Sequence, residues 1–420
     1  MHRFPVRFTS LVLTLAALLA GVRASTNGDN LLGIGPTARG LGGTGTAAPQ
    51  DALGAISGNP AGLSFLAADL PAESDVSLTF FVPHVSARVD ALSADSAAKT
   101  YLIPSLASAG PLGAKDGPWQ YGLAAYGVAG LGVDYRHSAV DTTLGPTPYP
   151  LVAGGRTQLQ VLEVAPSLAY KVSPEWSLGL ALDLDYGQLT LGGPTKSGFA
   201  AGLQPGVVFR PAAGFSLGAT YVSGKPVTYR GVTDFDGDGT ADNLKLEAPQ
   251  QFAFGAAYDF VPGKLLLLAD ARWVNWGGAK GYKDFDWQDT WVYGLGVQFE
   301  AIPKQLVLRA GYTFGDNPVK THQNFNGTGA PANVTNVQGK YVNNYYYETF
   351  RVIGFPAVVE QHLSFGLDYR LGAHATLQAG YTHAFKHTIT EQGTNLLGTP
   401  TTLSSGLSED SFELGFKYQY

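Results

Sequence analysis

The sequence predicts an all-β protein, a transmembrane antiparallel β-barrel of about 14 strands with an N-terminal hatch, or plug, inside its lumen. Apolar residues make up 45% of the chain and aromatic residues 12%. No segment approaches the ~18 consecutive apolar residues that a transmembrane helix needs. From residue 74 onwards, apolar residues instead alternate with polar or small ones, as in a strand with two different faces. Because backbone polar groups must be bonded internally in a membrane, such a chain crosses it as a closed barrel.

Residues 1–24 have the features of a secretory signal peptide. Arg3 and Arg7 begin the segment, an apolar run ends at Ala20, and the small residues of Val22-Arg23-Ala24 favour cleavage after Ala24. An apolar run of about thirteen residues is too short to anchor the chain as a membrane-spanning helix. We therefore expect an exported protein.

Residues 25–73 differ in composition and pattern from the rest of the chain. They are rich in Gly and Ala, lack clear alternation, and are interrupted by Pro36, Pro49 and Pro60. We expect this segment to form a compact hatch inside or beneath the barrel.

Residues 74–420 are the predicted barrel. Leu178, Leu180, Leu182 and Leu184 alternate with small or acidic residues, and aromatic residues alternate similarly through the C-terminal Tyr420. Tight turns are expected near 173–175, 213–214, 262–264, 303–304 and 372–374. Longer polar loops are expected near 136–157, 192–200, 231–243, 277–288, 316–356 and 390–408. Alternation of short periplasmic turns with long extracellular loops is typical of bacterial barrels, and an even strand number leaves both ends on the periplasmic side.

Composition narrows the classes of function. The chain has no cysteine, which excludes disulfides, thiolate nucleophiles and thiol metal sites. Its formal net charge of -6 argues against a nucleic-acid partner. We expect a monomer surrounded by outer-membrane lipids, with the barrel-assembly machinery recognising its C-terminal strand. A soluble extracellular β-protein remains an alternative.

Several charged residues occupy inward positions of the predicted strands. Arg210, Arg272 and Arg309 can bind an anionic head group through the bidentate guanidinium fork. Alternatively, the inward charges pair with one another and brace the wall, because unpaired buried charges are costly. The inward positions are Glu163, Asp183, Asp185, Arg210, Asp270, Arg272, Arg309, Asp368 and Arg370.

An acidic loop contains Asp234, Asp236, Asp238 and Asp242, with glycine at the sixth position from Asp234. This spacing resembles that of a calcium-binding loop, and a structural calcium is the one cofactor that we expect. Lys245 stands where a bidentate glutamate usually completes such a loop. An acidic surface turn is therefore an equal alternative.

No catalytic residues are predicted, and we do not expect an enzyme. His362 and Ser364 have the spacing of a catalytic pair on one strand. Leu363, Phe365 and Leu367 would face lipid, however, which turns His362 into the lumen. In the long loop, Tyr341, Tyr345, Tyr346 and Tyr347 either cap an apolar entrance or pack the loop itself.

The N-terminal segment carries the most specific resemblance. Gly35 to Leu66 reads GPTARGLGGTGTAAPQDALGAISGNPAGLSFL, with Asn59-Pro60-Ala61 just before the first strand. It resembles the hatch of the FadL/TodX family of outer-membrane transporters for long-chain fatty acids and aromatic hydrocarbons. VAPSLAYKVSPEWSLG at 164–179, ADARWVNW at 269–276, LRAGYTFGDNPV at 308–319 and LGFKYQY at 414–420 extend the resemblance over nearly the whole mature chain. The resemblance implies a fourteen-strand barrel with an internal hatch, which agrees with the count made from alternation.

The resemblance also implies passive uptake of a hydrophobic small molecule. The third extracellular loop, near 192–200, is too short for the helical insertion of the fatty-acid transporters. The basic residue that meets the carboxylate in the prototype has no counterpart beside Gly192 and Gly193. The solute therefore need not be a fatty acid. A general porin, an adhesin and a purely structural barrel remain alternatives.

A sideways exit into the bilayer is expected, because a hydrophobic solute gains little by entering periplasmic water. The third strand, Gln120 to Tyr135, contains Gly127, Gly130 and Gly132, and glycine within a strand often marks a bulge. In the family this strand kinks beside the hatch. We therefore predict that the Asn59-Pro60-Ala61 corner packs against a kink near Gly127 to Gly132.

Overall fold

A computed structural model describes residues 26–66, 72–141, 155–329 and 332–420, so the predicted signal peptide lies outside the described residues. Fourteen of the described strands form one closed antiparallel barrel, because the last pairs with the first. This confirms the predicted fold and strand number. The wall strands, in spatial order, are β3 (Glu73–Val89), β5 (Tyr101–Pro111), β6 (Trp119–Asp134), β7 (Arg156–Lys171), β8 (Trp176–Leu191), β9 (Lys196–Ala212), β10 (Phe215–Val222), β13 (Gln251–Val261), β14 (Leu265–Val274), β15 (Thr290–Ile302), β16 (Leu306–Gly315), β20 (Gln361–Arg370), β21 (Ala375–Thr394) and β22 (Pro400–Gln419).

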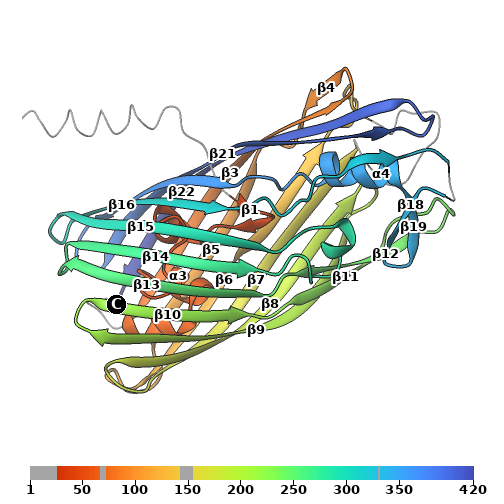
Figure 1. The fold of residues 1–420 in the computed structure, drawn as a ribbon. Coiled ribbons are helices and arrows are strands. Elements are labelled where there is room, and N and C mark those ends of the chain that lie inside the picture. Colours follow the sequence, from red (N-terminus) through yellow and green to blue (C-terminus); the bar gives the residue numbers. More distant parts are fainter. Residues whose placement is uncertain (1–25, 67–71, 142–154, 330–331) are drawn as a thin grey trace, which may run out of the picture.

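The connections alternate in length as predicted (Figure 1). Short turns and the C-terminus lie at one end of the barrel, which we call the periplasmic end, and the long excursions lie at the other. No helix in the described part of the chain is long and apolar enough to cross a membrane. Residues 390–408, predicted as a loop, belong mostly to β21 and β22, which pair up to Thr394 and Pro400. The expected loop at 192–200 is likewise shorter, because β9 already begins at Lys196.

The wall strands turn one face to lipid and one to the lumen. On β22, Phe412, Leu414 and Phe416 are exposed on the outside, whereas Glu413 and Lys417 are buried inside. Aromatic rings gather near both ends of the outer face. At the periplasmic end Trp176 stacks on Phe209 with ring centroids 4.1 Å apart, and such girdles mark the two membrane interfaces.

The extracellular excursions fold over and into the mouth of the barrel. They contain β4 (Leu92–Asp95), the hairpin of β11 (Lys225–Thr233) and β12 (Asp242–Ala248), η4 (Lys283–Phe285), β17 (Gln323–Asn326), β18 (Val334–Val337), β19 (Lys340–Asn343), α4 (Asn344–Thr349) and η5 (Phe350–Gly354). Phe350 and Phe355 pack on Phe285 and Trp287 in one continuous apolar cluster, which we call the cap. Tyr346 and Tyr347 are buried in this cluster, whereas Tyr341 is 62% exposed.

The hatch lies inside the barrel, as predicted (Figure 1). It comprises β1 (Thr26–Asn27), β2 (Asn30–Leu31), α2 (Gly35–Gly40), α3 (Ala52–Gly58) and η2 (Pro60–Phe65). Pro36 and Pro60 stand in the first turns of their helices, where a missing N–H costs nothing. Asp51 caps α3 by accepting a hydrogen bond from the Gly54 N–H, at 2.7 Å.

Inward-facing glycines on the wall make room for the hatch. A Cβ on Gly179 of β8 would lie 2.1 Å from the Ala61 nitrogen, and one on Gly218 of β10 would lie 2.1 Å from the Thr46 oxygen. The other wall glycines that meet hatch atoms closer than 3 Å are Gly122, Gly206, Gly255, Gly294, Gly296, Gly311, Gly315 and Gly415. This glycine band explains part of the chain's high glycine content.

Candidate functional site

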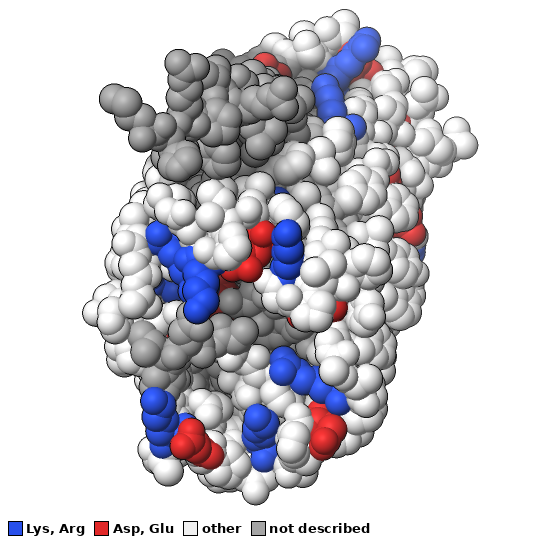
Figure 2. All heavy atoms as spheres, turned by 90° about the vertical axis from the view of Figure 1, so that its left-hand side faces the viewer, with Lys and Arg blue, Asp and Glu red and all other residues white. Residues whose placement is uncertain are grey.

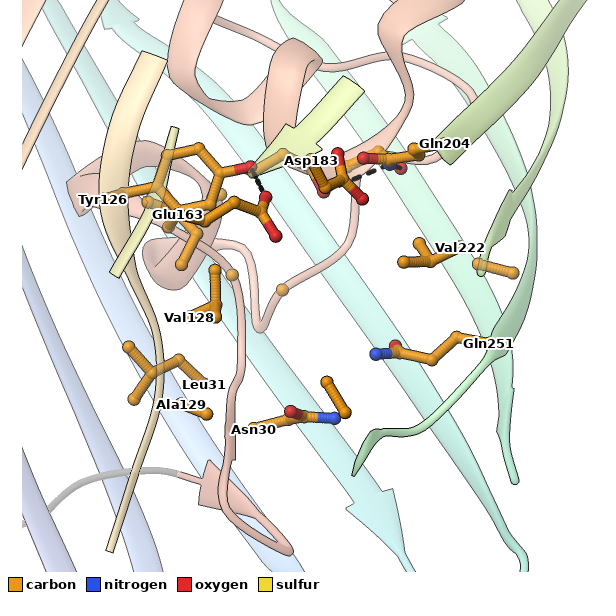
Figure 3. Close-up of a pocket in the computed structure, with 18 of the residues that line it drawn as sticks. Asn30, Leu31, Tyr126, Val128, Ala129, Glu163, Asp183, Gln204, Val222 and Gln251 are labelled. Carbon is orange, nitrogen blue, oxygen red and sulfur yellow. Dashed lines mark hydrogen bonds between the residues drawn. The ribbon is translucent and has the colours of Figure 1, made fainter. Parts of the chain in front are cut away.

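A cavity of about 140 Å³ lies in the lumen between the hatch and the cap. The hatch contributes Asn30 and Leu31 to its lining, and the wall contributes Tyr126, Glu163 and Gln251 (Figure 3). The cavity walls combine apolar side chains with hydrogen-bonding and charged groups. Such a lining is typical of a site for a small molecule that has an apolar body and a polar group.

One lysine meets three carboxylates in this cavity. Lys225 Nζ forms a salt bridge with Glu163 Oε2 and lies 3.1 Å from Asp185 Oδ1 and 3.7 Å from Asp183 Oδ2. The Tyr126 hydroxyl donates to Glu163 Oε1 at 2.6 Å (Figure 3). We call Glu163, Asp183 and Asp185 the acidic cluster.

Lys225 reaches the acidic cluster because β11 lies along the inner face of the wall. A Cβ on Gly202 of β9 would lie 2.6 Å from the Lys225 Cγ, and one on Gly187 of β8 would lie 2.2 Å from the Tyr229 hydroxyl. Lys225 was not among the inward positions predicted from the sequence, because it lies on β11, which is not a strand of the wall. The glycines at inward positions were the available signal that another segment lies against them.

The three predicted arginines lie in different places. Arg309 forms a bidentate pair with Asp368, with N–O distances of 2.5 and 3.0 Å. The Arg210 guanidinium lies 4.0 Å from the Phe65 ring and donates to the Phe65 carbonyl. Arg272 alone of the three lines the lumenal cavity. Arg309 therefore pairs with another inward charge and braces the wall, whereas Arg272 lies where it can contact a solute.

The wall is interrupted between β5 and β6. Their ladder runs from Pro111 and Gln120 to Ser105 and Tyr126, and beyond that point no further pair joins them among the described residues. At the extracellular side the Ala97 N–H again bonds the Asp134 carbonyl, at 2.8 Å. The interruption is therefore a gap with paired backbone on both sides, which we call the window.

Residue types explain the window. On one side, Pro104 has no N–H to donate to a ladder. On the other, β6 shifts register between Gly127 and Ala129, inside the predicted range. A cavity of about 140 Å³ lies at the window, lined by residues of the hatch, β3, β5, β6 and β7. Its lining includes Leu102, which is 58% exposed on the outer face.

The hairpin of β1 and β2 stands between this window and the lumen. Asn30 pairs with Ala129, and the Gly130 N–H donates to the Asp29 carbonyl at 3.0 Å. The lumenal cavity and the window cavity share Leu31, Ala129, Leu159 and Val161. The two spaces therefore adjoin at this hairpin, which we call the gate hairpin.

The predicted contact of the Asn59-Pro60-Ala61 corner is wrong. The Asn59 amide donates to the carbonyls of Thr46, at 2.7 Å, and of Val207 on β9, at 3.0 Å. Ala61 packs against Gly179. The corner thus meets β8 to β10, and the gate hairpin occupies the position at the kink instead. Alternation shows which strands have inward glycines, but not which hatch residues meet them.

Two charged groups hold the extracellular excursions together. Arg351 is buried and bonds Glu391 at 3.0 Å and also Glu348. His322 bonds Glu348 through Nδ1 and Asp286 through Nε2, each at 2.8 Å. The hydrogen bond to Glu348 raises the pKa of His322, although burial and Arg351 act in the opposite direction.

The acidic loop predicted to bind calcium surrounds a lysine from another excursion. Lys340 Nζ lies 2.9 Å from Asp242 Oδ1 and 3.0 Å from Asp236 Oδ2, with Asp238 at 3.5 Å. Asp234 instead accepts from the N–H groups of its own turn. The ammonium thus occupies the position among these carboxylates that the predicted calcium would take.

A third hollow opens at the periplasmic end, where basic and acidic side chains surround it (Figure 2). It measures about 810 Å³, and its lining includes Arg210, Lys264, Asp259 and Glu175. Pro49 and Gln50 of the hatch line both this hollow and the lumenal cavity. The hatch segment around them therefore separates the lumen from the periplasmic side.

His362 and Ser364 lie on the lumenal face of β20, and both are buried. Phe365 and Leu367 are exposed on the outer face. The predicted orientation of His362 is therefore confirmed.

Comparisons with known proteins agree with this architecture. The family model for outer membrane protein transport proteins (OMPP1/FadL/TodX) matches residues 22–326. The toluene transporter TodX of Pseudomonas putida is 17% identical, with a TM-score of 0.67 over 94% of this chain and 100% of that one. The toluene transporter TbuX of Ralstonia pickettii is 16% identical, with a TM-score of 0.65 over 93% and 99% of the two chains.

A FadL homologue of Pseudomonas aeruginosa is 15% identical, with a TM-score of 0.65 over 95% and 100% of the two chains. A search of curated sequences gave no match. At these identities the solved structures establish the shared fold, and the family model covers well over half of the chain. The chain therefore belongs to the OMPP1/FadL/TodX family of transport proteins of the bacterial outer membrane.

Proposed function

We propose that this protein takes up hydrophobic small molecules passively and releases them sideways, through the window between β5 and β6, into the bilayer. The family supplies the general role of transport. The observation that carries the sideways route is the window itself, with its own cavity beside the gate hairpin.

An apolar solute is more stable in the bilayer than in periplasmic water. Each methylene that a solute keeps out of water is worth about 0.8 kcal/mol, so the bilayer is a better destination than the periplasm. A sideways route must not leave backbone groups unbonded in lipid. The gate hairpin meets this condition on the lumenal side, because Asp29 accepts from the Gly130 N–H beside the bulge.

Entry from outside uses the apolar cap. A narrow cavity of about 10 Å³ lies among Leu189, Leu244, Phe350 and Phe355. It shares Leu246 and Tyr282 with the lumenal cavity below. A hydrophobic solute passes such a constriction by displacing side chains, whereas a hydrated sugar must first lose its water.

A reversible lock on the gate hairpin tests the route. The chain has no cysteine, so Asn30→Cys with Ala129→Cys adds one defined pair. Antiparallel partners lie about 4.5 to 5.5 Å apart at Cα, which suits a disulfide. We expect oxidation to abolish the entry of N-phenylnaphthylamine, an uncharged probe that fluoresces in phospholipid, into cells expressing the variant. Reduction should restore it.

A second lock provides the matched control. Ser64 of the hatch and Ser177 of β8 have hydroxyl oxygens 2.8 Å apart, far from the window. Oxidised Ser64→Cys with Ser177→Cys should leave probe entry unchanged. Undiminished entry through the oxidised gate lock, or equal loss with both locks, would overturn the proposed route.

We infer that the barrel acts as a monomer without catalysis, and that its aromatic C-terminal strand is recognised during assembly.

A further inference from the structure

The acidic cluster places three carboxyl groups beside a single ammonium. Lys225 is the one ammonium beside Glu163, Asp183 and Asp185 among the described residues. Asp183 and Asp185 are only 1% and 2% exposed. A buried carboxylate without a compensating charge or donor is costly, so this arrangement is incomplete as it stands.

The unsatisfied atoms identify where a ligand would bind. Glu163 is bonded by both Lys225 and Tyr126. Asp183 Oδ1 has no hydrogen-bond partner among the described residues, and Lys225 lies on the side of its other oxygen. Both aspartates line the lumenal cavity. A buried acceptor without a partner therefore belongs to a residue that lines a space large enough for a small molecule.

The position of the cluster links it to the exit. Glu163 pairs with Tyr126 across β6 and β7, and Tyr126 directly precedes Gly127, where the register of β6 shifts. A polar group held at the cluster would therefore leave the apolar part of the solute beside the gate hairpin.

We propose that the acidic cluster binds the protonated amine of a hydrophobic solute, so that the protein favours amphipathic organic cations over carboxylates of the same size. The inference rests on the proposed transport function and names its substrate class. The ammonium of the solute donates to the Asp183 and Asp185 carboxylates, and its charge compensates theirs. The apolar body lies against Leu31 and Val161.

Arg272 is the competing site for a polar group. It lines the same cavity from β14, four strands further round the wall from β8. A solute with a carboxylate would bind there rather than at the acidic cluster. The two possibilities predict opposite preferences, which makes the experiment decisive.

The test measures binding of three probes with the same aromatic body to the purified full-length barrel in detergent. They are 2-phenylethylamine, 3-phenylpropanoate and ethylbenzene, titrated calorimetrically at neutral pH. We expect the amine to bind about tenfold or more tightly than the carboxylate. Asp183→Asn with Asp185→Asn, which keeps side-chain volume, should remove the preference. Ethylbenzene, which carries no charge, is the reference against which the loss of amine binding in this variant is measured.

A second variant should act in the opposite direction. Lys225→Gln removes the resident ammonium, so the amine should bind more tightly than to the parent protein. Asp116→Asn, in an exposed periplasmic turn, makes the same charge change as one of the aspartate substitutions and should have no effect. Different migration of boiled and unboiled samples on a gel verifies that each variant is folded.

Equal or tighter binding of the carboxylate would overturn the proposal, and so would a preference for the amine that survives the double substitution. An amine that binds no better than ethylbenzene would also overturn it. The carboxyl groups of the cluster would then be protonated and would not recognise a cation. If N-phenylnaphthylamine entry fails in the parent protein, the transport function itself fails, which is a separate result.

Discussion

His322 joins three extracellular segments at a single side chain. It bonds Glu348 before η5 and Asp286 after η4, and its backbone N–H donates to Glu391 on β21. Its pKa is raised, chiefly by the hydrogen bond to Glu348, so the folded loop favours the charged imidazole. Such a group stabilises the folded loop below its unfolded pKa of 6.5, and this contribution is lost as pH rises through the higher folded value.

We therefore expect the loop around His322 to become less protected as the pH rises. Hydrogen exchange of residues 320–326, corrected for intrinsic rates, should show lower protection at about pH 8.5 than at about pH 6. His322→Gln should remove the difference while keeping the barrel folded. Protection that is independent of pH in the parent protein would contradict this role.

Lys340 forms ion pairs with the acidic loop and so affects whether the loop can bind a cation. Calcium binding by Asp234, Asp236, Asp238 and Asp242 stays a prediction, and the ion would have to displace an ammonium that already contacts three of these carboxylates. Lys340→Met leaves every carboxylate in place. We expect this variant to bind calcium more tightly than the parent protein, as measured by calorimetry. Equal affinity would show that Lys340 does not compete for the site.

Among the structural elements, the glycine band of the wall strands makes room for the hatch. Gly179→Val would place a Cβ 2.1 Å from the Ala61 nitrogen. Overpacking of this kind costs about 1 to 3 kcal/mol, and displacement of the hatch relieves it. We expect the variant barrel to conduct ions in planar bilayers above the parent level. Gly372→Val is the control, because no atom lies within 4 Å of its added Cβ. Parent-like conductance in Gly179→Val would contradict the role of the band.

The wall strands could be predicted from sequence, but the lumenal segments could not. Alternation identifies an inward position such as Asp183 or Arg309, because lipid tolerates few polar groups. It carries no information on which distant segment meets that position. Lys225 and the gate hairpin reach the lumen through loop and hatch conformations that are set by tertiary packing. Gly127 to Gly132 was correctly identified as irregular, whereas its hatch partner was not.

In the whole molecule, the lumenal cavity lies above the periplasmic hollow and beside the window cavity. The cap excludes water above, the hatch separates the lumenal cavity from the periplasmic hollow below, and the window lies at the side. A solute held in the lumen therefore meets the gate hairpin beside the bilayer. This arrangement supports the proposed selectivity for hydrophobic molecules, because a route for sugars would need continuous water through the hatch.

The most direct test compares two permeabilities of outer membranes with and without the protein. N-phenylnaphthylamine entry into whole cells reports on hydrophobic solutes, and swelling of vesicles in arabinose reports on an aqueous pore. We predict that the protein raises probe entry several-fold and leaves arabinose permeability at the level of membranes that lack it. Arabinose permeability that rises in parallel would show a general porin, and unchanged probe entry would contradict transport altogether.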